Sequence, residues 1–199
     1  MALVSLALAM LLSSLGTSSA NVGLPALAQA FHASFQAVQW IVLAYLLANT
    51  TLIVSAGRLG DVFGRRRLLL AGITLFTMAS ALCALAPTLG LLIAARAAQG
   101  LGGAIMMALA IAMIADTVPK AETGRAMGLL GTMSAIGTAL GPSLGGLLLA
   151  VFDWRAIFLI NLPLGIVAVA LASWSLPADQ PASTAGAFMI RLSMLRDSA

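Results

Sequence analysis

Six long apolar stretches, separated by short polar segments, make up most of the 199-residue chain. They occupy residues 2–24, 38–57, 68–85, 89–115, 125–151 and 156–176. A bilayer core of about 30 Å needs about 20 apolar residues in a helix that rises about 1.5 Å per residue, so each stretch is long enough to cross a membrane with ordinary tilt. The pattern therefore predicts an all-α integral membrane protein with six transmembrane helices.

The first stretch also has features of a secretory signal peptide. Residues 1–20 combine an apolar centre with a small-residue tail, and a cut after Ala20 fits that pattern. No lysine or arginine precedes the apolar centre, which argues against a cleaved signal peptide. We therefore expect residues 2–24 to remain as the first helix, followed by Pro25 and a polar connection through His32.

Composition and charge support a membrane location. Hydrophobic residues make up 61% of the chain and charged residues 8%, against roughly 45–50% and about 25% in soluble domains. Most lysines and arginines fall on one side of the six spans, which the positive-inside rule assigns to the cytoplasm. They are Arg58, Arg65, Arg66, Arg67, Lys120, Arg125, Arg191 and Arg196. This sorting predicts an inner (cell) membrane protein with both termini cytoplasmic, and its basic residues at helix ends do not indicate nucleic-acid binding.

A short charged turn lies between the second and third stretches. Residues 57–67 read Gly-Arg-Leu-Gly-Asp-Val-Phe-Gly-Arg-Arg-Arg, with Asp61 four residues after one glycine and three before another. Glycines let backbones approach closely, and the arginines remain on the cytoplasmic side. Any tight turn between two spans uses glycine and arginine, but such a turn does not require the aspartate.

The spacing G-x-L-x-D-x-x-G-R-R resembles the signature loop between helices 2 and 3 of the major facilitator superfamily of secondary transporters. The resemblance implies a cytoplasmic gate in which Asp61 pairs locally with Arg58 or Arg65 and faces the other half of the transporter. The implied gate residues are Gly57, Gly60, Asp61, Gly64, Arg65 and Arg66. Asp116 ends the fourth stretch on the same side, where we expect it to be solvated.

The resemblance also implies the fold. Major facilitator proteins are built from six-helix halves, each made of two inverted three-helix repeats. Residues 1–176 have the length of one such half, and residues 177–199 read as a cytoplasmic linker or truncated tail. A natural half, a truncated product and a fragment of a longer reading frame all fit this length.

Arg96 is the one charged residue that the pattern places inside a span. Burying an arginine in lipid costs roughly 2.5 kcal/mol or more, so Arg96 either faces a polar site or snorkels to the nearby outer interface. Residues 96–102 resemble the superfamily motif R-x-x-Q-G-x-G, which implies a role in proton transfer or its gating. The amides that we expect to contribute to transport or proton coupling are Gln99, Asn21 and Asn49, and Asn161 is a further candidate for the substrate path.

Glycines recur around a proline in the fifth stretch. The residues are Gly137, Gly141, Pro142, Gly145 and Gly146. Such glycines give a flat stripe for close helix packing, and the proline removes one backbone hydrogen bond and bends the helix. The pattern G-x-x-x-G-P-x-x-G-G resembles the antiporter motif of drug and proton exchangers in this superfamily, where it lies against the opposite half. Ordinary small-residue packing explains the glycines but not their placement with the proline.

Two further segments, residues 40–47 and 154–165, are similar to the fourteen-span drug/proton antiporter branch. One position departs from that branch. Its members commonly carry an aspartate in helix 1, and the matching residue here is Gly16. The role of that carboxylate cannot be transferred to this chain, and Asn21 is the nearest polar substitute.

These observations favour the amino-terminal half of a proton-coupled exporter of lipophilic or cationic small molecules that works by alternating access. Its expected partners are the lipid bilayer, substrate and protons, and a missing carboxy-terminal half or a second copy. The alternative is a truncated or half-transporter module that is inactive without its partner half. Neither hypothesis involves an enzyme, a cofactor or a metal, because Cys83 and His32 are each the only residue of their kind and the spans hold no reactive cluster.

Overall fold

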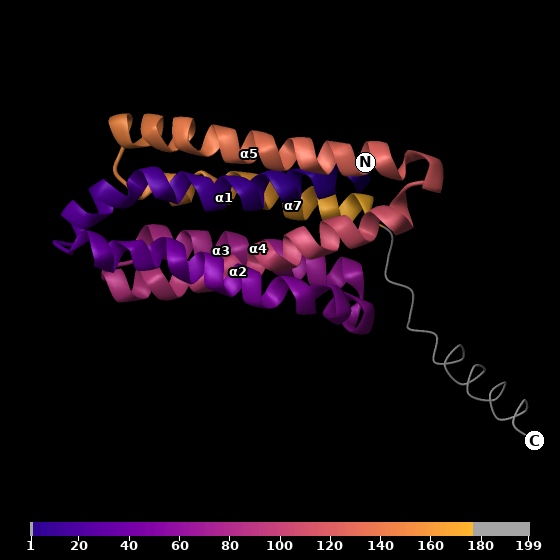
Figure 1. Ribbon diagram of the computed structural model, residues 1–199, viewed down its shortest axis with the longest axis horizontal. Coiled ribbons are helices and arrows are strands. Elements are labelled where there is room, and N and C mark those ends of the chain that lie inside the picture. The colour runs from indigo at the N-terminus through magenta and orange to yellow at the C-terminus, as the bar shows by residue number, and fades with distance from the viewer. Residues whose placement is uncertain (1, 177–199) are drawn as a thin grey trace, which may run out of the picture.

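The computed structural model describes residues 2–176, which form a bundle of long helices that run side by side (Figure 1). In chain order the elements are α1 (Ala2–Ala30), α2 (Phe35–Phe63), α3 (Arg65–Leu85), α4 (Leu89–Thr117), the 3₁₀ turn η1 (Lys120–Glu122), α5 (Thr123–Val151), α6 (Ala156–Leu159) and α7 (Asn161–Ser175). Six segments of this described part are long and apolar enough to span a membrane. The predicted all-α fold is confirmed, and the predicted tail at residues 177–199 lies outside the described residues.

The bundle consists of two three-helix units of matching size. In the first unit α1 and α2 have 29 residues each and α3 has 21. In the second unit α4 and α5 have 29 residues each, and the last span, Ala156–Ser175, has 20. If the two units are exchanged, α1 takes the place of α4 and α5 takes the place of α2. The α1–α5 and α4–α2 contacts are therefore equivalent, and they are the two most extensive helix contacts. This pairing is the one expected of inverted repeats.

Two helices are longer than the apolar stretches indicated. α1 continues through Pro25 to Ala30. Pro25 costs the helix one backbone hydrogen bond, a loss that membrane helices tolerate, and the fully buried Leu27 anchors the extra turn in the core. α2 continues to Phe63, so the residues expected to form a loop at 57–63 are helical.

The chain reverses between α2 and α3 at a single residue, Gly64. Its φ of 93° lies in the left-handed region that only glycine adopts without strain, which explains why a glycine stands here. The three arginines that follow form the first turn of α3. The predicted loop of eleven residues is therefore a one-residue corner between two helices.

The sixth span is interrupted at Ile160, between α6 and α7. Pro163 accounts for the break, because it has no N–H to donate to the Leu159 carbonyl and its ring crowds that carbonyl. Asn161 is the first residue of α7 and is buried. Ile160 is half-buried and keeps helical φ and ψ angles, whereas the neighbouring Asn161 is buried in the bundle.

Small residues bring α5 close to α1. A Cβ atom at Gly141 would lie 2.7 Å from Cβ of Ser18, and one at Gly137 would lie 2.7 Å from the Leu11 carbonyl oxygen. The contact also carries hydrogen bonds, because Ser18 Oγ donates to the Gly137 carbonyl at 3.2 Å and the hydroxyls of Ser14 and Ser134 are 2.8 Å apart. Close approach and hydroxyl bonds are how membrane helices associate without a hydrophobic driving force.

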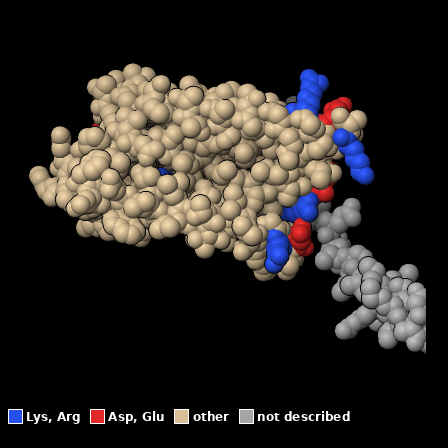
Figure 2. All heavy atoms as spheres, in the orientation of Figure 1, with Lys and Arg blue, Asp and Glu red and all other residues tan. Residues whose placement is uncertain are grey.

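Charged side chains gather at one end of the bundle, and most of the remaining surface in view is uncharged (Figure 2). We call this the charged end, formed by the α2–α3 corner and the α4–α5 connection. Asp153 and Arg155 form an ion pair at the opposite end. The uncharged belt between the two ends suits a bilayer interior, where exposed charge is costly.

The α1–α5 contact gives a first prediction. Gly141→Leu places a side chain where Ser18 and the α1 backbone already lie, and overpacking of this kind costs typically about 1–3 kcal/mol. Gly146→Leu is the matched control, because a Cβ there meets no atom within 4 Å. Thermal unfolding in detergent, followed by circular dichroism, should show a lower midpoint for Gly141→Leu and little change for the control. Equal midpoints for the two variants would contradict the close contact.

Candidate functional site

Arg96 is completely buried, two turns inside the start of α4. Its guanidinium does not reach the interface, so the snorkelling alternative is wrong. Nε donates to the Ile41 carbonyl on α2 at 3.2 Å, and Nη1 donates to the Gly16 carbonyl on α1 at 3.1 Å and to Oε1 of Gln99 at 2.5 Å. The side chain thus joins three helices of the bundle.

The ring of Tyr45 completes this environment. The Arg96 Cζ atom lies 4.3 Å from the ring centroid, a distance at which a desolvated cation–π contact contributes about 2 kcal/mol. The Tyr45 hydroxyl donates in turn to the Ser13 carbonyl at 3.2 Å. Tyr45 was not among the predicted site residues, although it is the only tyrosine in the chain.

Gln99 extends the buried network to α3. Its Nε2 donates to Oγ of Ser80 at 2.6 Å, and Ser80 donates to the Phe76 carbonyl at 2.8 Å. Each group in this network is neutral except Arg96. The acidic residues of the described chain, Asp61, Asp116, Glu122 and Asp153, all lie at helix ends. Within residues 2–176 the guanidinium is therefore held by dipoles and an aromatic ring, without a carboxylate.

The other predicted transport residues do not join this network. Asn49 is buried on α2 one turn beyond Tyr45, where its Nδ2 faces the sulfur of Met107 at 4.0 Å. Asn21 is exposed on α1. The structure thus places Arg96 and Gln99 together, whereas Asn49 lies on the same α2–α4 contact at a different level and Asn21 lies apart.

Arg65 organises the charged end. Its Nε and Nη2 lie 3.0 and 2.9 Å from Oδ1 of Asp61, one turn earlier at the end of α2. Nη1 reaches the end of α4, where it donates to Oδ2 of Asp116 at 2.7 Å and to the Ala112 carbonyl at 3.0 Å. The local pairing of Asp61 with Arg65 agrees with the prediction. The expectation that Asp116 is only solvated does not agree with the structure, because Asp116 also binds Arg65.

The glycines of the charged end differ in what they contact. A Cβ at Gly60 would lie 2.5 Å from Cδ2 of Leu109, so this glycine does allow α2 to approach α4. A Cβ at Gly57 would meet nothing within 4 Å, so the expected close approach at Gly57 is wrong. Gly64 provides the corner described above. The two glycines are about one turn apart on α2, and of the two only Gly60 lies at the contact with α4.

Arg66 reaches a different helix from its neighbour. Its Nη2 donates to the Ser173 carbonyl at 2.5 Å, in the last turn of α7. Carbonyls at the end of a helix lack intrahelical donors, and a cation there also interacts favourably with the helix dipole. Two consecutive arginines of α3 therefore bind the ends of α4 and α7.

The proposed antiporter motif has two faces. Gly137, Gly141 and Gly145 are buried against α1, within the same bundle, and not against an opposite half as the resemblance suggested. Pro142 is exposed on the other side of α5, and Gly146 meets no neighbour. α5 remains a continuous helix through Pro142.

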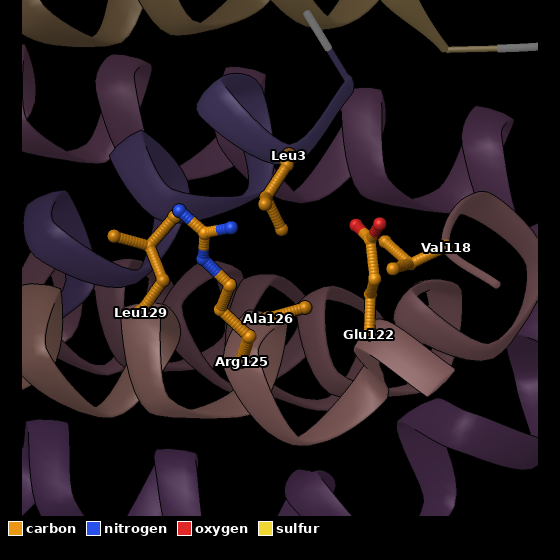
Figure 3. A pocket seen from close by; sticks show the side chains of 6 residues that line it. All are labelled: Leu3, Val118, Glu122, Arg125, Ala126 and Leu129. Carbon is orange, nitrogen blue, oxygen red and sulfur yellow. The ribbon is translucent and has the colours of Figure 1, made fainter. Parts of the chain in front are cut away.

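A hollow with a volume of about 530 Å³ opens at the charged end, between the start of α1, the end of α4 and the start of α5. Glu122 and Arg125 reach into this region from η1 and α5, towards Leu3 (Figure 3). The other lining residues are Val118, Ala126 and Leu129. The hollow therefore combines an apolar wall with one acid and one base. Residues 2–176 hold no group of three His, Cys, Asp or Glu side chains that could bind a metal.

Comparison with known proteins assigns the family. The sequence model of the Major Facilitator Superfamily matches residues 6–193. The chain belongs to this superfamily. It is therefore an integral membrane protein, as its six spans indicate.

Relatives within the superfamily are longer than this chain. Multidrug resistance protein Stp of Mycobacterium tuberculosis is 42% identical over 152 residues, which cover 76% of this chain and 28% of that protein. Riboflavin transporter RibZ of Clostridioides difficile is 37% identical over 175 residues, which cover 88% of this chain and 38% of that protein. The chain thus spans less than half the length of the relatives it matches.

Solved major facilitator structures share the fold. The proton:xylose symporter XylE, bound to 6-bromo-6-deoxy-D-glucose, superposes with a TM-score of 0.79 at 17% identity, over 89% of this chain and 44% of that one. A bacterial homolog of the human lysosomal transporter Spinster, in an inward-facing and occupied conformation, gives 0.77 at 17% identity, over 89% and 44%. The coverage confirms that the bundle is one half of a major facilitator fold.

The contacts of Arg65 give the second prediction. Arg65→Ala removes two ion pairs and the bond to the Ala112 carbonyl. Each exposed pair contributes about 1 kcal/mol or less, so a modest fall in unfolding midpoint is expected together with greater protease access to the ends of α2 and α4. Arg65→Lys should restore only part of the loss, because an ammonium lacks the planar fork that binds two partners. Arg58→Ala removes an equal charge from the same end and should have less effect; the reverse order would contradict the assignment.

Proposed function

We propose that this chain is the amino-terminal half of a secondary active transporter that exports lipophilic or cationic small molecules in exchange for protons. The family membership supports transport by alternating access, in which two six-helix bundles rock about a central site. We assign the charged end to the cytoplasm, because basic residues concentrate in the cytoplasmic turns of membrane proteins. With that orientation both termini lie in the cytoplasm, and we place the protein in the inner membrane.

The observation that carries the proposal is the buried position of Arg96. An arginine inside the bilayer is costly, and residues of this kind mark substrate or proton pathways by default. Here the guanidinium has no carboxylate partner within residues 2–176, so it acts as a fixed positive charge in the middle of the bundle. A carboxylate of the other half that faces this charge would gain and lose protons as the two halves move.

Export of lipophilic or cationic compounds is supported by the name of one relative and by the hollow at the charged end. The Mycobacterium tuberculosis relative is called a multidrug resistance protein. The hollow offers apolar contacts from Leu3, Val118 and Leu129 and one carboxylate, that of Glu122. The apolar wall fits a lipophilic compound at its cytoplasmic entry, where the charge of Glu122 is balanced by that of Arg125.

The Arg65 contacts support a gate at the same end. Arg65 ties the end of α2 to the end of α4, and Arg66 ties the start of α3 to the end of α7. These bonds hold the four helix ends as one unit. A half that moves as a rigid body in alternating access requires such a connection.

A second candidate, a half-transporter module that is inactive alone, is favoured by the exposed faces of α2 and α5. In the most apolar 18-residue segment of each helix, only 22% is buried in α2 and 17% in α5, against 67% in α1 and 61% in α4. The exposed face of α5 carries small and polar residues, among them Gly128, Gly131, Thr132 and Ser143. Small residues suit contact with other helices, so this face fits the missing carboxy-terminal half or a second copy.

The third prediction concerns Arg96. Vesicles in which this chain is joined by a carboxy-terminal half or pairs with a second copy should show efflux of a fluorescent lipophilic cation when a proton gradient is imposed, and Arg96→Ala should abolish it. Arg96→Lys keeps the charge but cannot reach Ile41, Gly16 and Gln99 together, so partial activity is expected. Efflux that is unaffected by Arg96→Ala would remove this residue from the mechanism. Absence of efflux from the unaltered chain would favour the half-transporter module.

The fourth prediction tests whether a second copy covers α5. In a Cys83→Ser background, Leu140→Cys on the exposed face of α5 should form a disulfide-linked dimer in membranes under mild oxidation. Met78→Cys on α3 is the control, since Met78 is also exposed but lies on a helix that packs against α4 and α7. Cross-linking at both positions, or at neither, would contradict pairing through α5.

A further inference from the structure

Two buried side chains keep hydrogen-bonding groups that find no partner within residues 2–176. Nη2 of Arg96 has none, although the rest of the guanidinium is fully bonded. Both side-chain atoms of Asn161, Nδ2 and Oδ1, also have none. Arg96 is 0% exposed and Asn161 is 1% exposed, so bulk solvent does not satisfy them. Buried polar groups in native proteins are bonded to protein or to ordered water with few exceptions.

The contacts around these two residues place them in the same region. The Phe158 ring, one turn before Asn161 in the sequence, has its centroid 5.9 Å from Cζ of Arg96. On the other side, a Cβ at Gly165 would lie 2.9 Å from Cβ of Thr77, which fixes the level of α7 against α3. Because α3 and α7 run in opposite directions, Asn161 lies one turn from this contact on the side of Ser80.

Ser80 is the end of the network that begins at Arg96 and continues through Gln99. Asn161 is one turn before Gly165 on the same face of α7, so it lies at the level of this network on the side of α7 that contacts α3. At the interruption of the sixth span, Pro163 has no N–H to donate to the Leu159 carbonyl. The junction of α1, α3, α4 and α7 thus holds four buried polar side chains, those of Ser80, Arg96, Gln99 and Asn161.

The three unpaired hydrogen-bonding groups define which molecule can bind between them. Arg96 Nη2 and Asn161 Nδ2 can only donate, whereas Asn161 Oδ1 can only accept. A simple anion would satisfy the donors and leave Oδ1 without a bond. Water donates and accepts, and buried waters typically make about three bonds to groups of this kind. Water is therefore the molecule that can bond to both the donors and the acceptor.

We infer that Arg96 and Asn161 enclose an internal water site at the junction of α1, α3, α4 and α7, in which water accepts from Arg96 Nη2 and donates to Asn161 Oδ1. Asn161 is then a positioning residue that holds the guanidinium through this water. The site does not depend on the proposed transport function, because it rests only on the burial and bonding of these side chains.

Hydroxyl radical footprinting by X-ray radiolysis of the full chain in nanodiscs tests this site. Radicals form from water in place, so a buried side chain is oxidised only where water lies beside it. Phe158 should be oxidised although it is 1% exposed. Met106 is the dry reference, because it is fully buried in an apolar cluster and methionine reacts readily with these radicals. Oxidation of Phe158 no greater than that of Met106 would overturn the proposal.

Variants at residue 161 test whether the water beside Phe158 is bound by Asn161. Asn161→Leu keeps the branch at Cγ but replaces both polar atoms by methyl groups, so the labelling of Phe158 should fall to the level of Met106. Asn161→Ser keeps a donor and an acceptor, and labelling should persist. Phe158 labelling that is unchanged in a folded Asn161→Leu protein would separate the water from Asn161 and overturn the assignment. If Asn161→Leu does not fold, the comparison of Phe158 with Met106 in the unaltered chain still decides whether the site is wet.

Discussion

Burial of one guanidinium in a lipid-embedded bundle is the constraint on which the rest of the structure depends. An arginine at the centre of a membrane helix costs about 2.5–3.5 kcal/mol on insertion scales, and Arg96 lies two turns inside α4. Here the cost is offset by two backbone carbonyls, one amide oxygen and the ring of Tyr45. These groups come from α1, α2 and α4, so the charge is stable only when the three helices are assembled. Arg96 therefore makes bundle formation and site formation the same event.

The inverted repeats explain how such a site is framed. α1 and α4 are the first helices of their units and lie deepest, each packed along the second helix of the other unit. Glycines make both contacts close, because a Cβ at Gly141 would strike α1 and one at Gly100 would lie 3.1 Å from Cβ of Ala48 on α2. Within so tight a frame the polar side chains have little freedom, and fixed dipoles can replace solvent around the charge.

The number of spans and the all-α fold could be predicted because apolar runs of membrane length are unambiguous in a chain with so few charges, whereas the family was predicted from the resemblance of residues 57–66 to the superfamily's signature loop. The sequence also singled out Arg96 and Gln99, which are bonded to each other. The partners from other helices, such as Tyr45 and Ser80, could not be predicted, since one sequence does not say which helix faces meet. The ends of α1 and α2 were predicted too early for a related reason. Leu27 beyond Pro25 and Gly60 beyond Gly57 pack against other helices, and these contacts cannot be read from local sequence.

The departure at residue 16 now has a physical meaning. Gly16 lies directly beside Arg96, and its carbonyl accepts from Nη1 at 3.1 Å. No side chain fits there, because a Cβ would lie 2.5 Å from Cζ of Phe76. The position at which the resembled branch carries an aspartate is therefore filled by an aromatic ring of α3. A backbone carbonyl cannot take up a proton at physiological pH, so any proton that is exchanged against the charge of Arg96 must be carried by a group outside the first helix.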